Sequence, residues 1–108
     1  MKFYYRASQD PIHLRLLEDQ VFKFELDCSQ WAEDNGTVTS ATATVKTGSV
    51  SAGTPTVASN VITMSLTQTT SGVSRVELSF TDGTYTGIQN LFIRYIDRNS
   101  ILNDGYEL

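Results

Sequence analysis

The sequence predicts an all-β fold: an immunoglobulin-like antiparallel β-sandwich of about seven strands, with extended arms at its N- and C-terminal ends. The first observation behind this is composition, since 14 of the 108 residues are threonine, 11 are serine and only 19% are charged. Ordinary soluble domains have about 25% charged residues, and threonine, valine and aromatic residues favour strands. The second observation is that short segments of alternating polarity are separated by turns rich in Gly, Asn, Asp and Ser, which is typical of a sandwich.

The clearest strand covers residues 22–28, where apolar side chains alternate with charged ones, as in a strand with one buried face. Trp31 follows, ahead of an Asn35-Gly36 turn, and we expect its large ring to cap one end of the core. Four more segments alternate in the same way and are separated by turn sequences: 37–47, 62–67, 76–80 and 91–97.

The last of these segments carries apolar residues on both faces. We expect Leu91, Ile93 and Tyr95 to face the core. Phe92, Arg94 and Ile96 then lie on the opposite, outward face. Either another element covers this outward face, or it is an exposed apolar strip.

We divide the chain into an N-terminal arm (1–19), an immunoglobulin-like sandwich (20–98) and a C-terminal tail (99–108). The arm has no convincing period and is interrupted by Pro11. Its aromatic residues either fold back on the sandwich or dock on a neighbour, because aromatic residues and arginine are enriched in interface cores. The candidate partner-binding residues lie in the arm and the tail: Phe3, Tyr4, Tyr5, Arg6, Tyr106 and Leu108.

Residues 47–74 contain no charged residue at all. A contact surface without charges avoids the cost of stripping water from ions when a partner binds. The alternative is that this stretch is simply a solvent-exposed β surface, to which threonine is well suited.

Catalytic, cofactor and metal sites are not expected. His13 is the one histidine and lies in the arm, so no Ser–His–Asp arrangement is indicated. The lone cysteine, Cys28, is either a reactive thiol or a small buried residue, and we favour the buried position because free cysteine is among the most buried residue types. No phosphate-binding or dinucleotide-binding motif is present in the sequence.

Nucleic acid and membrane partners are not expected either. The eight Lys and Arg residues are scattered among twelve Asp and Glu residues, giving a net charge of −4. No apolar run approaches the roughly 20 residues that span a bilayer, and the first residues lack the apolar stretch of a secretory signal.

The order of several features resembles a known family. Asp10-Pro11 is followed by the 22–27 strand, then by Ser29-Gln30-Trp31-Ala32, an acidic Asn-Gly turn and the 37–45 strand. This order resembles the small immunoglobulin-like proteins of tailed bacteriophages that act as fiber–tail adaptors and related virion components. The resemblance covers about 10–98; it departs from the family pattern at Ala43 and Thr44, where an aromatic residue is usual.

The resemblance implies a structural protein without an active site, located in the tail or neck of a virion assembled in the host cytoplasm. It implies protein partners: tail, portal or neck proteins, the fiber protein, and neighbouring copies in a symmetric ring. Two other functions stay open. One is a capsid decoration protein, and the other is a free carbohydrate-binding or adhesive module, for which Tyr85 is the candidate aromatic contact.

Overall fold

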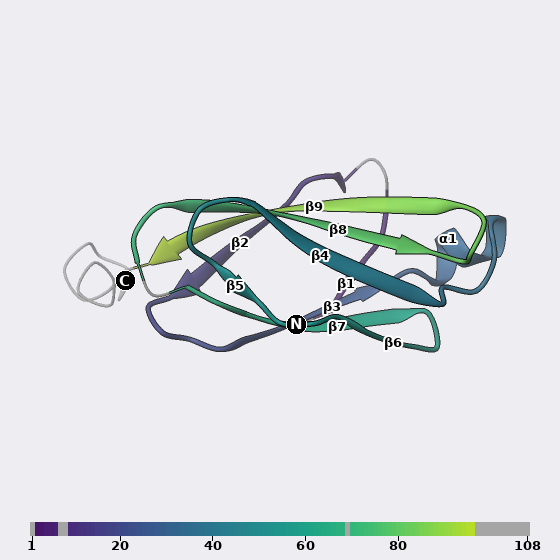
Figure 1. Cartoon of the computed structure of the whole chain (residues 1–108), viewed down its shortest axis with the longest axis horizontal. Helices are drawn as coiled ribbons and strands as arrows, with labels where there is room; N and C mark the ends of the chain where they lie inside the picture. Colours follow the sequence, from purple (N-terminus) through teal and green to yellow (C-terminus); the bar gives the residue numbers. More distant parts are fainter. Residues whose placement is uncertain (1, 7–8, 69, 97–108) are drawn as a thin grey trace.

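A computed structural model describes residues 2–6, 9–68 and 70–96 and confirms an all-β sandwich (Figure 1). The described residues form nine strands, more than the predicted seven, and one short helix, α1 (Ser29–Asp34). One sheet has five strands: β1 (Lys2–Tyr4), β3 (Phe22–Asp27), β7 (Val61–Thr67), β5 (Ser51–Ala52) and β6 (Thr56–Ala58). The other has four: β2 (Ile12–Leu17), β9 (Thr86–Ile96), β8 (Val73–Thr81) and β4 (Ser40–Thr47).

The sheets are mixed, so the prediction of a purely antiparallel sandwich is wrong in two places. β1 pairs in parallel with β3, and β2 pairs in parallel with β9. The remaining pairings are antiparallel. The cause is the N-terminal segment, which contributes one strand to the edge of each sheet and runs in the same direction as its neighbour in both.

Residues 1–19 do not form an arm over the part that the structure describes, and this prediction is corrected. β2 pairs with β9 along all six of its residues and buries Ile12, Leu14 and Leu16 in the core. Burial of three aliphatic side chains, each worth about 1.5–3 kcal/mol, holds this segment on the sandwich. The predicted tail, residues 99–108, lies outside the described residues.

The core lies between the two sheets and is closed at one end by α1. Phe24 and Phe80 are the largest fully buried side chains. Trp31 on α1 packs edge-on against Phe80, with 5.0 Å between ring centroids, so it caps one end of the core as the sequence predicts. Gly87 lies beneath this pair, and a side chain there would collide with the Phe80 ring.

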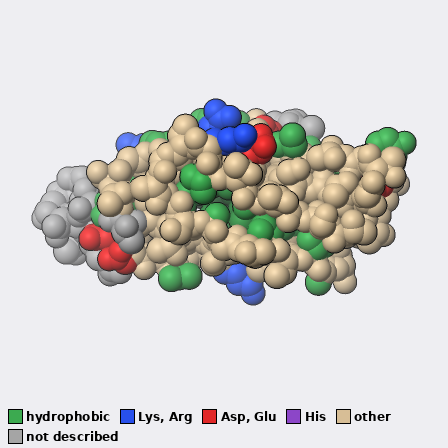
Figure 2. Space-filling model, in the orientation of Figure 1, with side chains coloured by type: hydrophobic (Ala, Val, Ile, Leu, Met, Phe, Trp, Pro, Cys, Tyr) green, Lys and Arg blue, Asp and Glu red, His purple; other side chains and the backbone are tan. Residues whose placement is uncertain are grey.

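Part of the uncharged stretch 47–74 is internal rather than surface. The buried Gln68 donates from its amide nitrogen to two carbonyl groups of the following turn, and its Oε1 accepts from the Ser74 hydroxyl at 3.0 Å. The same hydroxyl accepts from the backbone N–H groups of Ser49 and Val50. This network ties two loops together, while the exposed face over β4, β5 and β6 carries charged side chains only toward its margins (Figure 2).

Candidate interaction site

Two of the predicted partner-binding residues, Phe3 and Tyr5, pack against the core of the sandwich. The ring of Phe3 stacks on Phe24 with centroids 5.4 Å apart, and the ring of Tyr5 meets Phe80 edge-on at 5.1 Å. Both side chains are partly buried against the core. Of the two alternatives for the N-terminal aromatic residues, folding back on the sandwich is therefore correct for Phe3 and Tyr5.

Tyr4 and Arg6 lie on the opposite side of the same segment and are exposed. Tyr4 keeps 58% of its surface accessible. Successive side chains of an extended segment point to opposite faces, which explains why Tyr4 and Arg6 are exposed whereas Phe3 and Tyr5 pack against the core. The other two predicted contacts, Tyr106 and Leu108, lie outside the described residues.

Lys2 fixes the position of this exposed segment. Its Nζ lies 3.3 Å from Oδ2 of Asp27 on β3 and 5.6 Å from the centre of the Tyr4 ring. The pKa of Asp27 is lowered, first by a hydrogen bond from the Ser29 side chain, with further contributions from the Ser29 backbone N–H and from Lys2. Asp27 is therefore an anion at neutral pH, and it joins β1, β3 and α1.

A hollow of about 230 Å³ opens where β1 meets the start of α1, and we call it the end groove. Both charge signs and two aromatic rings are present in it. Its lining residues are Tyr4, Tyr5, Arg6, Asp27, Ser29, Gln30 and Glu33. Such a mixed lining suits a protein contact, since Tyr and Arg can pack and hydrogen-bond at once.

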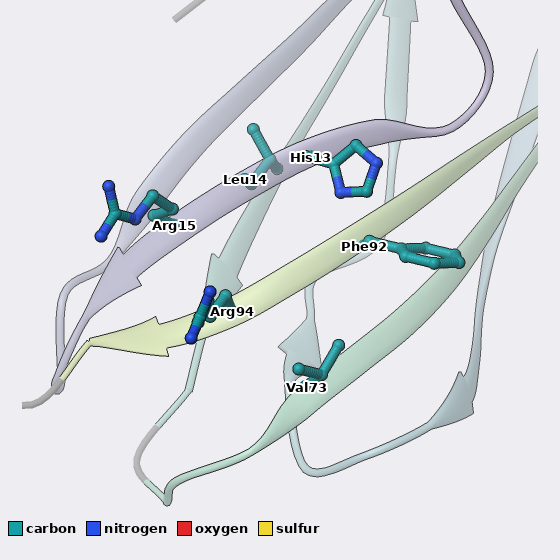
Figure 3. A pocket seen from close by; sticks show the side chains of 6 residues that line it. All are labelled: His13, Leu14, Arg15, Val73, Phe92 and Arg94. Atoms are coloured by element: carbon teal, nitrogen blue, oxygen red, sulfur yellow. The ribbon is translucent and has the colours of Figure 1, made fainter.

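A second hollow lies on the outer face of the four-stranded sheet (Figure 3). It is lined by His13, Leu14, Arg15, Val73, Phe92 and Arg94. Val73 is 60% exposed and Phe92 is partly exposed. The outward face of 91–97 is therefore neither fully covered nor an open apolar strip: at Phe92 it is partly covered, by the ring of His13 on β2. The sequence analysis did not predict this site. The alternation of aliphatic and polar side chains in 12–17 was the signal that could have identified the segment as a strand with His13 and Arg15 on its outer face.

The thiol of Cys28 is fully buried, as we favoured from the sequence. Burial raises its pKa to about 12, and the nearby Asp27 carboxylate adds to the effect. The thiol is therefore protonated at neutral pH and is a poor nucleophile.

No three His, Cys, Asp or Glu side chains in the described part of the chain gather closely enough to hold a metal ion. No helix among the described residues has the length and apolar character needed to cross a membrane.

Tyr85, the candidate sugar contact, is 57% exposed in the hairpin between β8 and β9. Asp82 holds this hairpin, because its Oδ1 accepts from the backbone N–H groups of Thr84 at 2.8 Å and Tyr85 at 2.6 Å. These two hydrogen bonds lower the pKa of Asp82. Ile88, three residues further along on β9, is also 45% exposed, but it is aliphatic, so Tyr85 is the one exposed aromatic ring among the described residues of this hairpin.

Comparison with known proteins gives a fold but no family. No family model and no curated protein matches the sequence. Two solved structures align over most of both chains at a TM-score of 0.49: a cysteine protease inhibitor from Entamoeba histolytica (12% identity, 86% of this chain and 95% of that one) and amebosin (8% identity, 88% and 96%).

A third solved structure is an endo-fucoidan hydrolase of glycoside hydrolase family 107. It aligns with a TM-score of 0.53 and 14% identity, over 83% of this chain. The alignment covers 13% of the hydrolase chain, so this protein spans a small part of that enzyme's length. At such identity the likeness shows a shared β-sandwich fold and carries no information on activity.

Proposed function

We propose that this protein is a non-catalytic component of a tailed-phage particle, an adaptor that joins the tail or neck to fibers through protein–protein contacts. The observation that supports it best is the end groove, where the exposed Tyr4 and Arg6 stand beside Glu33 on a rigid scaffold. The sequence resemblance supplies the class of partner. Tyrosine and arginine dominate the binding energy of many protein interfaces.

The end groove is preorganised for such a contact. Phe3 and Tyr5 anchor the segment from below, and Lys2 bridges to Asp27 from the side. Little conformational freedom is left to lose when a partner packs on Tyr4, and low ordering entropy favours affinity.

The end groove is smaller than a full interface. Stable contacts bury about 800 Å² on each partner, so the partner also covers surface around the groove. The tail residues Tyr106 and Leu108 remain part of the proposed contact.

Incorporation into particles tests the proposal. Particles of the phage that carries this gene are purified with wild-type protein, and copies per particle are counted by quantitative mass spectrometry. A fixed number that follows the tail is expected. A number that follows the capsid contradicts the adaptor role and indicates decoration, and absence from particles rejects both.

Variants then test the end groove itself. Tyr4→Ala and Arg6→Glu should each lower incorporation about tenfold, the effect of losing roughly 1.4 kcal/mol of binding. Tyr85→Ala is the matched control, because Tyr85 is as exposed as Tyr4 but lies on another loop. Equal incorporation of all three variants rules out the end groove. The carbohydrate-binding alternative is tested separately on a glycan array. Binding to a glycan that is lost in Tyr85→Ala and kept in the other two variants supports that alternative instead.

A further inference from the structure

Strand register gathers basic and aromatic side chains on the outer face of the four-stranded sheet. β2 lies beside β9 with His13 opposite Phe92 and Arg15 opposite Arg94. β8 continues both rows on the far side of β9. The face therefore carries two adjacent cross-strand rows, His13–Phe92–Arg75 and Arg15–Arg94–Val73, and we call these six residues the basic face.

The basic face concentrates positive charge on an acidic protein. Three of the five arginines of the chain stand on it, although the net charge is −4. Glu77, two residues along from Arg75 on β8, pairs with Lys46 at 3.8 Å. Within the described part of the chain, no salt bridge involves Arg75 or Arg94.

This arrangement matches the chemistry of carboxylates. Guanidinium groups present a planar fork of donors that binds a carboxylate through two parallel hydrogen bonds. Figure 3 shows the side chains of Arg15 and Arg94 on neighbouring strands at one end of the hollow, with Phe92 and His13 at the other. A ligand that carries both anionic and apolar groups along an extended backbone would contact both ends.

The apolar part of the basic face favours a polypeptide over a sugar chain. Phe92 is only partly exposed, and its ring contacts that of His13 with centroids 5.4 Å apart and an interplanar angle of 74°, so it is not the broad exposed aromatic surface on which a sugar ring stacks. Val73 beside it is aliphatic and 60% exposed. Arginine with aromatic and aliphatic residues is the composition of a protein interface core, and clusters of arginine recognise acidic motifs.

We propose that the basic face is a docking site for an acidic polypeptide segment of a partner protein. Asp or Glu carboxylates of the partner accept hydrogen bonds from Arg15, Arg75 and Arg94, and one of its apolar residues packs on Phe92 and Val73. The hollow of about 560 Å³ is large enough for several side chains. This surface differs from the end groove, and the inference does not depend on the adaptor role.

Peptide binding to the full chain provides the test. A fluorescein-labelled peptide of about twelve residues that repeats Glu-Leu-Asp-Glu is titrated, and anisotropy is recorded. We expect saturable binding that weakens as salt rises, because screening shortens the reach of exposed charges to about 10 Å at 0.1 M. The matched peptide Gln-Leu-Asn-Gln should not bind.

Variants of single residues show whether the peptide binds at the basic face or responds only to the net charge of the protein. Arg94→Glu and Arg75→Glu should each weaken binding at least tenfold, and Val73→Ser severalfold. Lys23→Glu on β3 is the control, since it makes the same charge change on the other sheet. All variants alter exposed positions, and circular dichroism verifies that they fold.

Three results would overturn the proposal: no binding of the acidic peptide, equal weakening by Lys23→Glu and Arg94→Glu, or tighter binding of heparin or a DNA oligonucleotide than of the peptide. The first two exclude a specific site, and the third assigns the surface to another class of polyanion. Particle incorporation of the end-groove variants is measured separately, so failure of the adaptor role is distinguishable from failure here.

Discussion

The carboxylate of Asp10 accepts two hydrogen bonds from Asn90, one from its backbone N–H at 2.6 Å and one from its side-chain amide at 2.9 Å, across 80 positions of sequence. A third comes from Nε2 of the buried Gln89 at 2.9 Å. These bonds hold the start of β2 against β9. They therefore contribute to the register between β2 and β9 on which the basic face depends.

Asp10→Ala should lower the free energy of unfolding by about 1 to 3 kcal/mol, because charge-assisted hydrogen bonds are lost and the Gln89 amide is left with fewer partners. Urea unfolding followed by circular dichroism measures it. Asp34→Ala removes an equal charge from an exposed position of α1 and should change little. If both variants unfold at the same urea concentration, the Asp10 bonds do not stabilise the fold.

The stability should depend on Asp27 in acid. The pKa of this carboxyl is lowered from 3.8 in the folded state, so the folded chain favours the anion. Its contribution is present above pH 3.8 and is lost as pH falls through the folded pKa. In Asp27→Asn the free energy of unfolding should therefore fall less steeply between pH 5 and pH 2 than in the wild type. Urea unfolding at a series of pH values measures this. If the variant and the wild type lose stability equally steeply as pH falls, the pKa of Asp27 is the same in the folded and unfolded states.

Cys28 should resist thiol reagents in the native protein. With its pKa raised to about 12, the thiol is protonated at pH 8, and burial blocks access. Labelling with a chromogenic disulfide reagent should be slow in buffer and complete in seconds in concentrated urea. Fast labelling in buffer would place the thiol at the surface.

Phe3→Ala and Tyr4→Ala should differ although the residues are neighbours. Phe3 stacks on the buried Phe24, so its loss should cost about 2 kcal/mol. Tyr4 is exposed, and its loss should change stability by less than about 0.5 kcal/mol. Thermal unfolding compares the pair. Equal, small effects would show that β1 is dispensable to the sandwich, as an arm would be.

Much of the sandwich follows from local pattern. In β3, β7, β8 and β9 one face is buried, so apolar and polar side chains must alternate, and the sequence shows it directly. The same rule separates Phe3 and Tyr5 from Tyr4 and Arg6, once the segment is known to be a strand.

The candidate sites depend on pairings between distant segments. β2 joins β9 in parallel nearly eighty residues away, and no local sequence signal encodes a partner at that distance. The sequence by itself determined the class of fold, the alternation of β3, β7, β8 and β9, and the burial of Cys28. Tertiary structure alone decided that His13 and Arg15 stand beside Phe92 and Arg94, because cross-strand neighbours are chosen by register, and register is set by burial and hydrogen bonding of the whole sheet.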